Sequence, residues 1–224
     1  MLCKPQRLRN PVLFSAFALA FLWLATFGMV HPALASPMKI VAFGDSLMAG
    51  YQLGPKQGFV PRLQAALNEK GYEVEVVNAA VSGDTTTGGK ARLDWSIPDD
   101  ADLVLLELGA NDMLRGLPPA TTRANIDSML ARLNERAIPV MLIGMRAAPQ
   151  LGPDYVRDFE SIFPDLAQKY GVPLVPFFLE GVAANRQFLL ADGMHPNPEG
   201  VEVLVKNVLP EVILIVENRE NTEG

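Results

Sequence analysis

Five short apolar runs recur along the chain, separated by longer segments of mixed polarity. Three of the runs consist almost entirely of Val, Leu and Ile and do not alternate with polar residues. Strands of a parallel sheet that is covered on both faces have such continuous apolar sequences. The runs therefore predict five parallel strands, at residues 38–43, 73–78, 102–109, 139–144 and 172–177.

Helical spacing is found in the segments between and after these runs. Apolar residues there recur at intervals of three or four positions, which is typical of helices with one buried face. We expect Gly71 and Gly171 to follow two helix ends, Pro164 to kink a helix and Pro210 to end the last one. The polar residues 217–224 are expected to be disordered. The spacing predicts helices at residues 60–67, 126–137, 156–170 and 201–208.

The first 35 residues have the three parts of a secretory signal. Three basic residues precede an uncharged run over residues 11–30, and an Ala-x-Ala pattern ends at Ala35. This order is typical of a cleaved signal peptide. We therefore expect cleavage after Ala35, a single α/β domain at residues 36–216, and a periplasmic or secreted protein. Because the run is long enough to span a bilayer, an uncleaved N-terminal anchor is the alternative.

Cleavage would change the composition of the protein. The mature chain would keep 16 Lys plus Arg against 25 Asp plus Glu, a net charge of −9. No basic run remains, so we do not expect a nucleic-acid partner. The only cysteine, Cys3, would be removed, which excludes a cysteine nucleophile and a Cys-ligated zinc. His31 would also be removed, leaving His195 as the only histidine.

Polar and glycine residues cluster after the first three strands and before the last helix. In an open parallel sheet, function gathers at the carboxyl edge of the strands. We expect the clusters to share this edge. They are Gly44-Asp45-Ser46, Ser82-Gly83-Asp84, Gly109 with Asn111 and Asp112, and Asp192 with His195.

Together these clusters supply the parts of a serine hydrolase site. A serine hydroxyl becomes a nucleophile when a base takes its proton, and the base needs a partner that fixes its tautomer. Ser46 is the candidate nucleophile, His195 the base and Asp192 its partner. The oxyanion formed by attack needs donors that are already in place. The candidates are the backbone N–H groups of Ser46 and Gly83 and the amide of Asn111.

Each cluster also has a simpler structural interpretation. Gly-Asp-Ser is a common turn, and Gly83 could belong to an ordinary turn. Asn111 with Asp112 could cap a helix, and His195 could be a structural histidine in a turn before a helix. Four aspartates could suggest a metal site, but they lie in separate loops without a second histidine, so no metal is expected. These aspartates are Asp45, Asp84, Asp112 and Asp192.

Four segments resemble the sequence blocks of the SGNH (GDSL) hydrolases, in the family's order. They are "FGDSLMAGYQL", "VSGDTTTGG", "LELGANDMLRG" and "DGMHPNPEG". The resemblance covers essentially the whole mature chain and is closest to the bacterial periplasmic thioesterase I, lysophospholipase and arylesterase group. It implies a flavodoxin-like three-layer α/β/α sandwich with strand order 2-1-3-4-5. It also implies Ser46, Asp192 and His195 as the catalytic triad, with Ser46, Gly83 and Asn111 as oxyanion donors.

The resemblance further implies a substrate class. Members of the family hydrolyse acyl esters or thioesters through an acyl-serine intermediate, without a cofactor. We expect a monomer that acts on a small-molecule or lipid ester and contacts membrane lipid transiently. A carbohydrate O-acetylesterase is one alternative, and a binding module that has lost catalysis is another.

Two loops are expected to affect how substrate enters and binds. The segment "GMRAAPQLG" at residues 144–152 corresponds to a loop that helps line the acyl site in relatives. The small residues "TTTGG" at 85–89 could form a loop that moves as substrate enters. We expect substrate contacts from Asp45, Met145, Arg146, Ala147 and Pro149.

Overall fold

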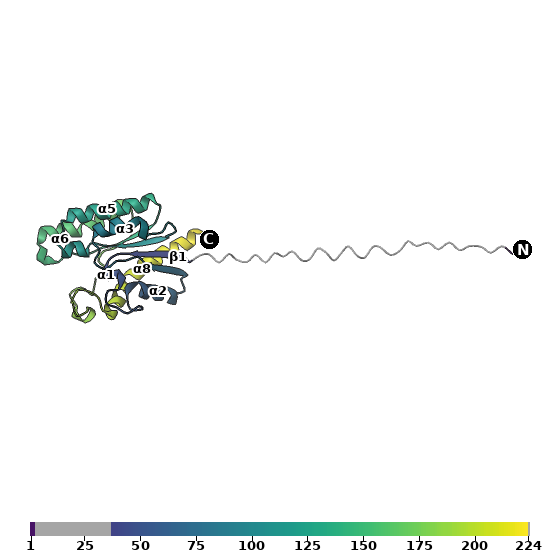
Figure 1. Ribbon diagram of the computed structural model, residues 1–224, viewed down its shortest axis with the longest axis horizontal. Helices are drawn as coiled ribbons and strands as arrows, with labels where there is room; N and C mark the ends of the chain where they lie inside the picture. The colour runs from purple at the N-terminus through teal and green to yellow at the C-terminus, as the bar shows by residue number, and fades with distance from the viewer. Residues whose placement is uncertain (3–36, 224) are drawn as a thin grey trace. The chain divides into compact units, whose positions relative to one another are not determined.

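A five-stranded parallel sheet lies at the centre of the fold in the computed structural model (Figure 1). The structure describes residues 1–2 and 37–223, so the predicted signal or anchor lies outside the described residues. The strand order is β2-β1-β3-β4-β5, which confirms the order implied by the resemblance. The strands are β1 (Met38–Phe43), β2 (Val74–Asn78), β3 (Leu103–Glu107), β4 (Val140–Ile143) and β5 (Leu174–Val175).

The continuous apolar runs are buried as predicted. Every residue of β3 and β4 is buried, because helices cover both faces of the central strands. The edge strand β5 has only two residues and is shorter than the predicted run at 172–177. Pro173 and Pro176 flank β5, and neither can donate a backbone hydrogen bond to the sheet.

Helices form a layer on each face of the sheet (Figure 1). On one face, α5 (Pro119–Glu135) packs against α3 (Thr86–Ser96) and α6 (Pro153–Glu160). On the other face, α2 (Phe59–Glu69) packs against α8 (Pro198–Glu223). This is the predicted three-layer sandwich. None of the helices within residues 37–223 is both long and apolar enough to cross a membrane.

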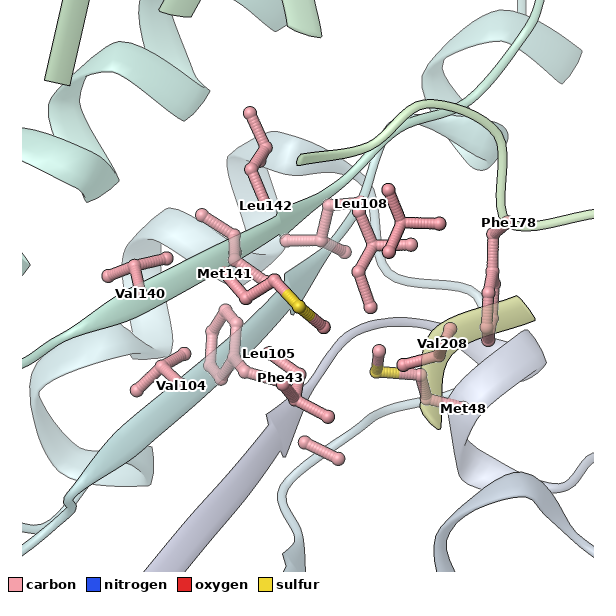
Figure 2. Packing of buried hydrophobic residues seen from close by; sticks show 14 of the residues in the cluster. Phe43, Met48, Val104, Leu105, Leu108, Val140, Met141, Leu142, Phe178 and Val208 are labelled. Atoms are coloured by element: carbon pink, nitrogen blue, oxygen red, sulfur yellow. The ribbon is translucent and has the colours of Figure 1, made fainter. Parts of the chain in front are cut away.

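The core joins the sheet to the short helix that follows β1. Phe43, Leu105 and Met141 come from the neighbouring strands β1, β3 and β4, and each is fully buried (Figure 2). Met48 of α1 (Ser46–Ala49) is also fully buried, as is Val208 of α8. Burial of Met48 therefore anchors α1 to the core.

Two of the predicted helices have different limits in the structure. Helix α5 ends at Glu135, so Ala137 lies beyond it, in a left-handed conformation with φ 54°. The predicted helix at 156–170 is divided at Ser161 into α6 and α7 (Ile162–Tyr170). Pro164 explains the break, since a proline ring inside a helix clashes with the carbonyl four residues earlier.

The last helix is longer than the sequence pattern predicts. Helix α8 contains Pro210 and continues to Glu223, so the prediction of a helix end before Pro210 and of disorder at 217–223 was wrong. Val212 and Val216 extend the buried face of the helix and are at most 2% exposed. Their packing outweighs the single hydrogen bond that Pro210 removes, because tertiary burial provides most of a helix's stability.

The small residues at 85–89 begin a helix and are not a mobile loop. Thr85 is the N-cap of α3, and its side chain accepts a hydrogen bond from the Gly88 N–H at 3.3 Å. A Cβ at Gly89 would lie 2.3 Å from Leu108 Cδ1, so α3 approaches the sheet closely there. Glycine permits this close approach.

Candidate active site

Ser46 begins α1 directly after the carboxyl end of β1. Asp45 is the N-cap of this helix, and its Oδ1 accepts a hydrogen bond from the Leu47 N–H at 3.0 Å. A Cβ at Gly44 would lie 2.8 Å from the Glu107 carbonyl oxygen, so the turn packs tightly against β3. The turn thus holds the half-buried Ser46 at the edge of the sheet.

The structure brings together Ser46, Asp192 and His195, as predicted from the sequence. His195 Nε2 lies 2.9 Å from Ser46 Oγ, although 149 positions separate the two residues. On the other side of the ring, His195 Nδ1 lies 2.7 Å from Asp192 Oδ2. The imidazole therefore bridges the hydroxyl and the carboxylate, and the interpretation of His195 as a purely structural histidine does not account for this contact.

Backbone hydrogen bonds hold Asp192 in its ionised form. Its Oδ1 accepts from the Met194 N–H at 2.9 Å and from the His195 N–H at 3.0 Å. These two hydrogen bonds lower the pKa of Asp192 to about 2, and the bond from Met194 has the larger effect. The carboxylate therefore stays charged at any pH at which neutral His195 can act as a base.

Tyr51 lies against the ring of His195, a contact that the sequence did not reveal. The two ring centroids are 4.5 Å apart and the planes are tilted by 39°. Tyr51 is 40% exposed, so its outer face remains open to solvent. The only signal in the sequence was its place five residues after Ser46, within the segment "FGDSLMAGYQL".

Gly83 lies in the loop after β2, in a left-handed conformation with φ 85°. Its carbonyl accepts a hydrogen bond from Arg115 Nη2 at 2.9 Å. Its N–H has no acceptor within residues 37–223. The turn interpretation of Gly83 is correct, since Asp84 N–H bonds to the Val81 carbonyl at 3.2 Å, and the turn leaves an exposed donor free.

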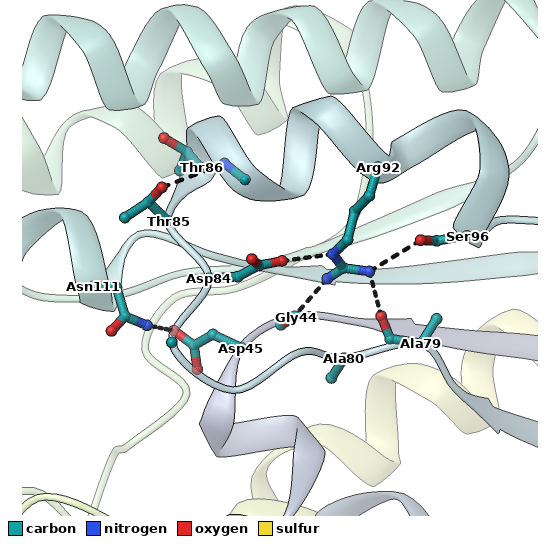
Figure 3. Close-up of polar contacts among 12 residues, drawn as sticks. Gly44, Asp45, Ala79, Ala80, Asp84, Thr85, Thr86, Arg92, Ser96 and Asn111 are labelled. Atoms are coloured by element: carbon teal, nitrogen blue, oxygen red, sulfur yellow. Dashed lines mark hydrogen bonds and ion pairs between the residues drawn. The ribbon is translucent and has the colours of Figure 1, made fainter.

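Asn111 is the second residue of α4 (Ala110–Leu114), whose N-cap is Gly109. Asn111 therefore does not cap the helix, and that interpretation was wrong. Its side-chain Nδ2 donates to Asp45 Oδ2 at 3.0 Å (Figure 3). Since an amide carries two hydrogens on this nitrogen, one N–H is fixed by Asp45 and the other is left for a ligand.

Asp45 is fully buried, which argues against its predicted contact with substrate. Both of its carboxylate oxygens accept hydrogen bonds inside the protein, from Leu47 and Asn111. Burial raises the pKa of Asp45 to about 6, against the opposing effect of these two bonds. Asp45 thus connects the start of α1 to the amide of Asn111.

Arg92 of α3 fixes the loop after β2, and the sequence analysis missed it. Its guanidinium, in a residue 6% exposed, lies 3.9 Å from the centroid of the Phe43 ring. It donates to Gly44 O at 3.1 Å, to Ala79 O at 2.5 Å and to Asp84 Oδ2 at 2.5 Å (Figure 3). One buried cation therefore ties the loop that carries Gly83 to the turn that carries Ser46.

The loop after β4 presents only some of its predicted substrate contacts. Met145 and Ala147 are buried in the core, at 2% and 7% exposure. Arg146 is exposed, and its guanidinium lies 5.1 Å from the centroid of the Phe177 ring. Pro149 is also exposed and begins a short 3₁₀ helix. Of the four substrate contacts predicted in this loop, Arg146 and Pro149 are therefore the two that a substrate could reach.

The four aspartates have separate partners. Asp84 pairs with Arg92, and Asp112 accepts from the Thr86 N–H at 2.8 Å and from the Thr122 hydroxyl at 3.3 Å. No group of three or more His, Cys, Asp and Glu side chains in the described part of the chain is arranged to hold a metal ion.

Known proteins share both the sequence and the fold. Residues 42–203 match the GDSL-like Lipase/Acylhydrolase family. The chain is similar to an arylesterase of Vibrio mimicus, 38% identical over 191 residues, which are 85% of this chain and 96% of that protein. It is also similar to thioesterase 1/protease 1/lysophospholipase L1 of Escherichia coli (strain K12), 37% identical over 179 residues, 79% of this chain and 82% of that protein. The crystal structure of TesA matches with a TM-score of 0.75 and 38% identity, covering 80% of this chain and 99% of the other.

Proposed function

Because this chain belongs to the GDSL-like lipase/acylhydrolase family and is an ester-hydrolysing serine hydrolase, we propose that it cleaves acyl esters or thioesters through an acyl-Ser46 intermediate. The observation that carries this proposal is the continuous contact from Ser46 Oγ to His195 Nε2, at 2.9 Å, and from His195 Nδ1 to Asp192, at 2.7 Å.

Acylation follows from this geometry. Ser46 Oγ forms a bond to the carbonyl carbon of the substrate while its proton passes to His195 Nε2. Asp192 stabilises the resulting imidazolium, since its carboxylate faces Nδ1 and remains charged. The tetrahedral intermediate then expels the alcohol or thiol, which leaves with the proton from His195. Water repeats the sequence on the acyl-serine and releases the acid.

Three donors serve the oxyanion in this proposal. Ser46 is the first residue of α1, where backbone N–H groups have no partner within the helix. Gly83 contributes an exposed N–H, and Asn111 contributes the amide hydrogen that Asp45 leaves free. Donors of this kind stabilise the charge that develops on the carbonyl oxygen, and such donors are among the largest contributions to catalysis.

The exposed apolar side chains near the carboxyl edge favour a substrate whose non-reacting part is an acyl or aryl group. Five large apolar residues in the segments that connect the strands and helices near this edge, two of them in short helices, are between 37% and 59% exposed. A carbohydrate ester would place polar hydroxyls against these side chains, so we retain the O-acetylesterase only as an alternative. The residues are Tyr51, Val81, Leu114, Leu151 and Met194.

We also propose that the protein is exported as a monomer, with residues 1–35 removed as a signal peptide. The basic, apolar and Ala-x-Ala segments support this proposal. An exported location would allow contact with membrane lipids as a source of substrate.

A labelling experiment tests the nucleophile. A fluorophosphonate should add one phosphonyl group to the purified protein, as seen by intact mass, and Ser46→Ala should abolish both labelling and turnover of aryl esters and acyl-CoA. Ser82→Ala is a matched control, since Ser82 is an exposed serine next to Gly83. An unlabelled wild-type protein would favour the alternative of a binding module without catalysis, and a labelled Ser46→Ala protein would place the nucleophile elsewhere.

A further inference from the structure

A second acid lies beneath the turn that carries Ser46. Glu107 is the last residue of β3 and is fully buried, although the rest of this strand is apolar. Its Oε2 accepts a hydrogen bond from the Asp45 N–H at 3.3 Å. Its Oε1 has no hydrogen-bond partner in the described part of the chain. A buried charge is costly unless it is paired and fully hydrogen-bonded, and Glu107 is neither.

Within residues 37–223, no cation forms an ion pair with Glu107. A Cβ at Gly44 would lie 2.7 Å from Glu107 Oε2, so the carboxyl group packs directly against the backbone before Asp45. Arg92 is a buried cation of this region, and its hydrogen bonds go to Asp84, to Ser96 and to two backbone carbonyl oxygens. None of these hydrogen bonds of Arg92 goes to Glu107.

The carboxyl group of Asp45 accepts more hydrogen bonds from the protein than that of Glu107 does. It accepts from the Leu47 N–H at 3.0 Å and from the Asn111 amide at 3.0 Å, at the start of a helix. Two acids that share a buried site cannot both be ionised without strong repulsion, so the charge resides where the donors are. Those donors belong to Asp45.

We propose that Glu107 is a positioning residue that acts as a neutral carboxylic acid, leaving the negative charge of the pair on Asp45 so that Asp45 can hold the Ser46 turn and orient the Asn111 amide. This role rests on the proposed function of Ser46 and Asn111. It assigns no contact between Glu107 and substrate. Glu107 acts on the reaction only through Asp45.

The electrostatic environment agrees with this assignment. Burial, and then the charge of Asp45, raise the pKa of Glu107 well above its usual value. Asp45 in turn faces His195, which lowers its pKa, and Asp84, which raises it. Arg92 reaches this region through Gly44 O. The folded protein thus binds a proton on Glu107 that an unfolded chain releases above pH ~4.3.

A pH series on Glu107→Gln tests whether this acid is neutral. The folded wild type binds the extra proton, so its stability must fall as pH rises above ~4.3 and until the folded pKa is passed. Glu107→Gln is a neutral isostere and lacks this dependence. The melting temperature of Glu107→Gln minus that of the wild type should therefore increase with pH. Glu75→Gln is the matched control, because Glu75 is exposed on β2 and should show no such increase.

Kinetics and infrared spectra test the positioning role. Glu107→Gln should keep kcat within about threefold of wild type, whereas Glu107→Ala should lower kcat by roughly tenfold or more with KM changed less. The carbonyl band of a protonated carboxyl group should be present in the wild type and lost in Glu107→Gln. A melting-temperature difference that is constant above pH ~5, or a Glu107→Gln enzyme as impaired as Glu107→Ala, would overturn the proposal.

These measurements are separable from the proposed function. If Glu107→Ala does not fold, the pH series and the infrared band on Glu107→Gln still decide the charge of Glu107, since neither needs catalysis. Fluorophosphonate labelling of Ser46 in wild type tests the nucleophile by itself. A failure of labelling with a rising melting-temperature difference would reject the hydrolase site and retain the neutral acid.

Discussion

Single hydrogen bonds decide which atoms of the site can act on a substrate. Asn111 can present one amide hydrogen because Asp45 holds the other, at 3.0 Å. His195 can present Nε2 because Asp192 holds Nδ1, at 2.7 Å. In both cases a carboxylate behind the acting group fixes its orientation, so the orienting residues are as testable as the reacting ones.

Replacing Asn111 by alanine should lower kcat by roughly 10²–10³, about 2.7–4 kcal/mol, with little change in KM, because an oxyanion donor acts mainly in the transition state. Steady-state kinetics and a melting curve on the same variant separate catalysis from folding. Asn134→Ala, an exposed asparagine on α5, is the control and should leave kcat unchanged. A near-normal kcat in Asn111→Ala would remove the third donor from the mechanism.

Asp192→Asn should alter both turnover and acid stability. Turnover should fall severely, because the neutral amide does not stabilise the imidazolium. Folding lowers the pKa of Asp192 to about 2, from ~3.9 in an unfolded chain. Its contribution to stability is therefore present above pH ~3.9 and is lost as pH falls toward 2.

Melting temperatures of wild type and Asp192→Asn from pH 7 downward measure this contribution. The wild type should be the more stable protein at neutral pH, and the difference should shrink as pH falls below ~3.9 and be lost near the folded pKa of about 2. A difference that persists unchanged at pH ~2 would contradict the assigned ionisation of Asp192.

At the scale of helices and strands, features set by the local sequence pattern could be predicted, whereas features set by long-range packing could not. The strands were predictable because the apolar runs are only six to eight residues long and rich in Val, Leu and Ile, which favours a buried strand over a buried helix. The end of α8 was not, since Pro210 is a local signal and the burial of Val212 and Val216 is a tertiary one. The proximity of Ser46, Asp192 and His195 was predictable because each is a polar residue at a strand end or in a loop. Arg92 and Glu107 were missed, because only the packed sheet shows which groups they approach.

Gly200 of α8 packs closely against the segment that precedes this helix. A Cβ at this position would lie 2.2 Å from the Phe188 carbonyl oxygen and 3.1 Å from Pro196 Cβ. Gly200→Ala should therefore displace the loop that carries Asp192 and His195. We expect a loss of about 1–3 kcal/mol of stability and a kcat lowered roughly 10–100-fold.

Melting curves and kinetics on Gly200→Ala check both effects. Glu199→Ala, at an exposed position in the same turn of α8, should change either quantity far less. Unchanged kcat in Gly200→Ala would show that the loop can move without disturbing the contact between Ser46 and His195.

For the whole molecule, the sheet is the frame that brings distant segments of the chain to one edge. Parallel strands place their carboxyl ends together, so loops after β1, β2 and β3 meet the loop before α8. If residues 1–35 are removed, the net charge of the domain would be −9, and such a charge favours solubility through repulsion between molecules.

Intact mass of the exported protein should give an N-terminus at Ser36, because the Ala-x-Ala pattern ends at Ala35. Ala35→Leu should block cleavage and retain the full-length chain, since signal peptidases require a small residue there. A wild-type chain that begins at Met1 and sediments with membranes would favour the anchor.

Ser46 and His195 are separated by 149 positions in the sequence, and this separation has a consequence for biosynthesis. A chain emerging from the ribosome would display its nucleophile early and its base only after most of the domain has been made. Until the loop before α8 docks on the first turn, Ser46 has no base and cannot be acylated at a useful rate. Until that docking, the growing chain would thus not be acylated at Ser46 by the lipids and thioesters of the cell that synthesises it.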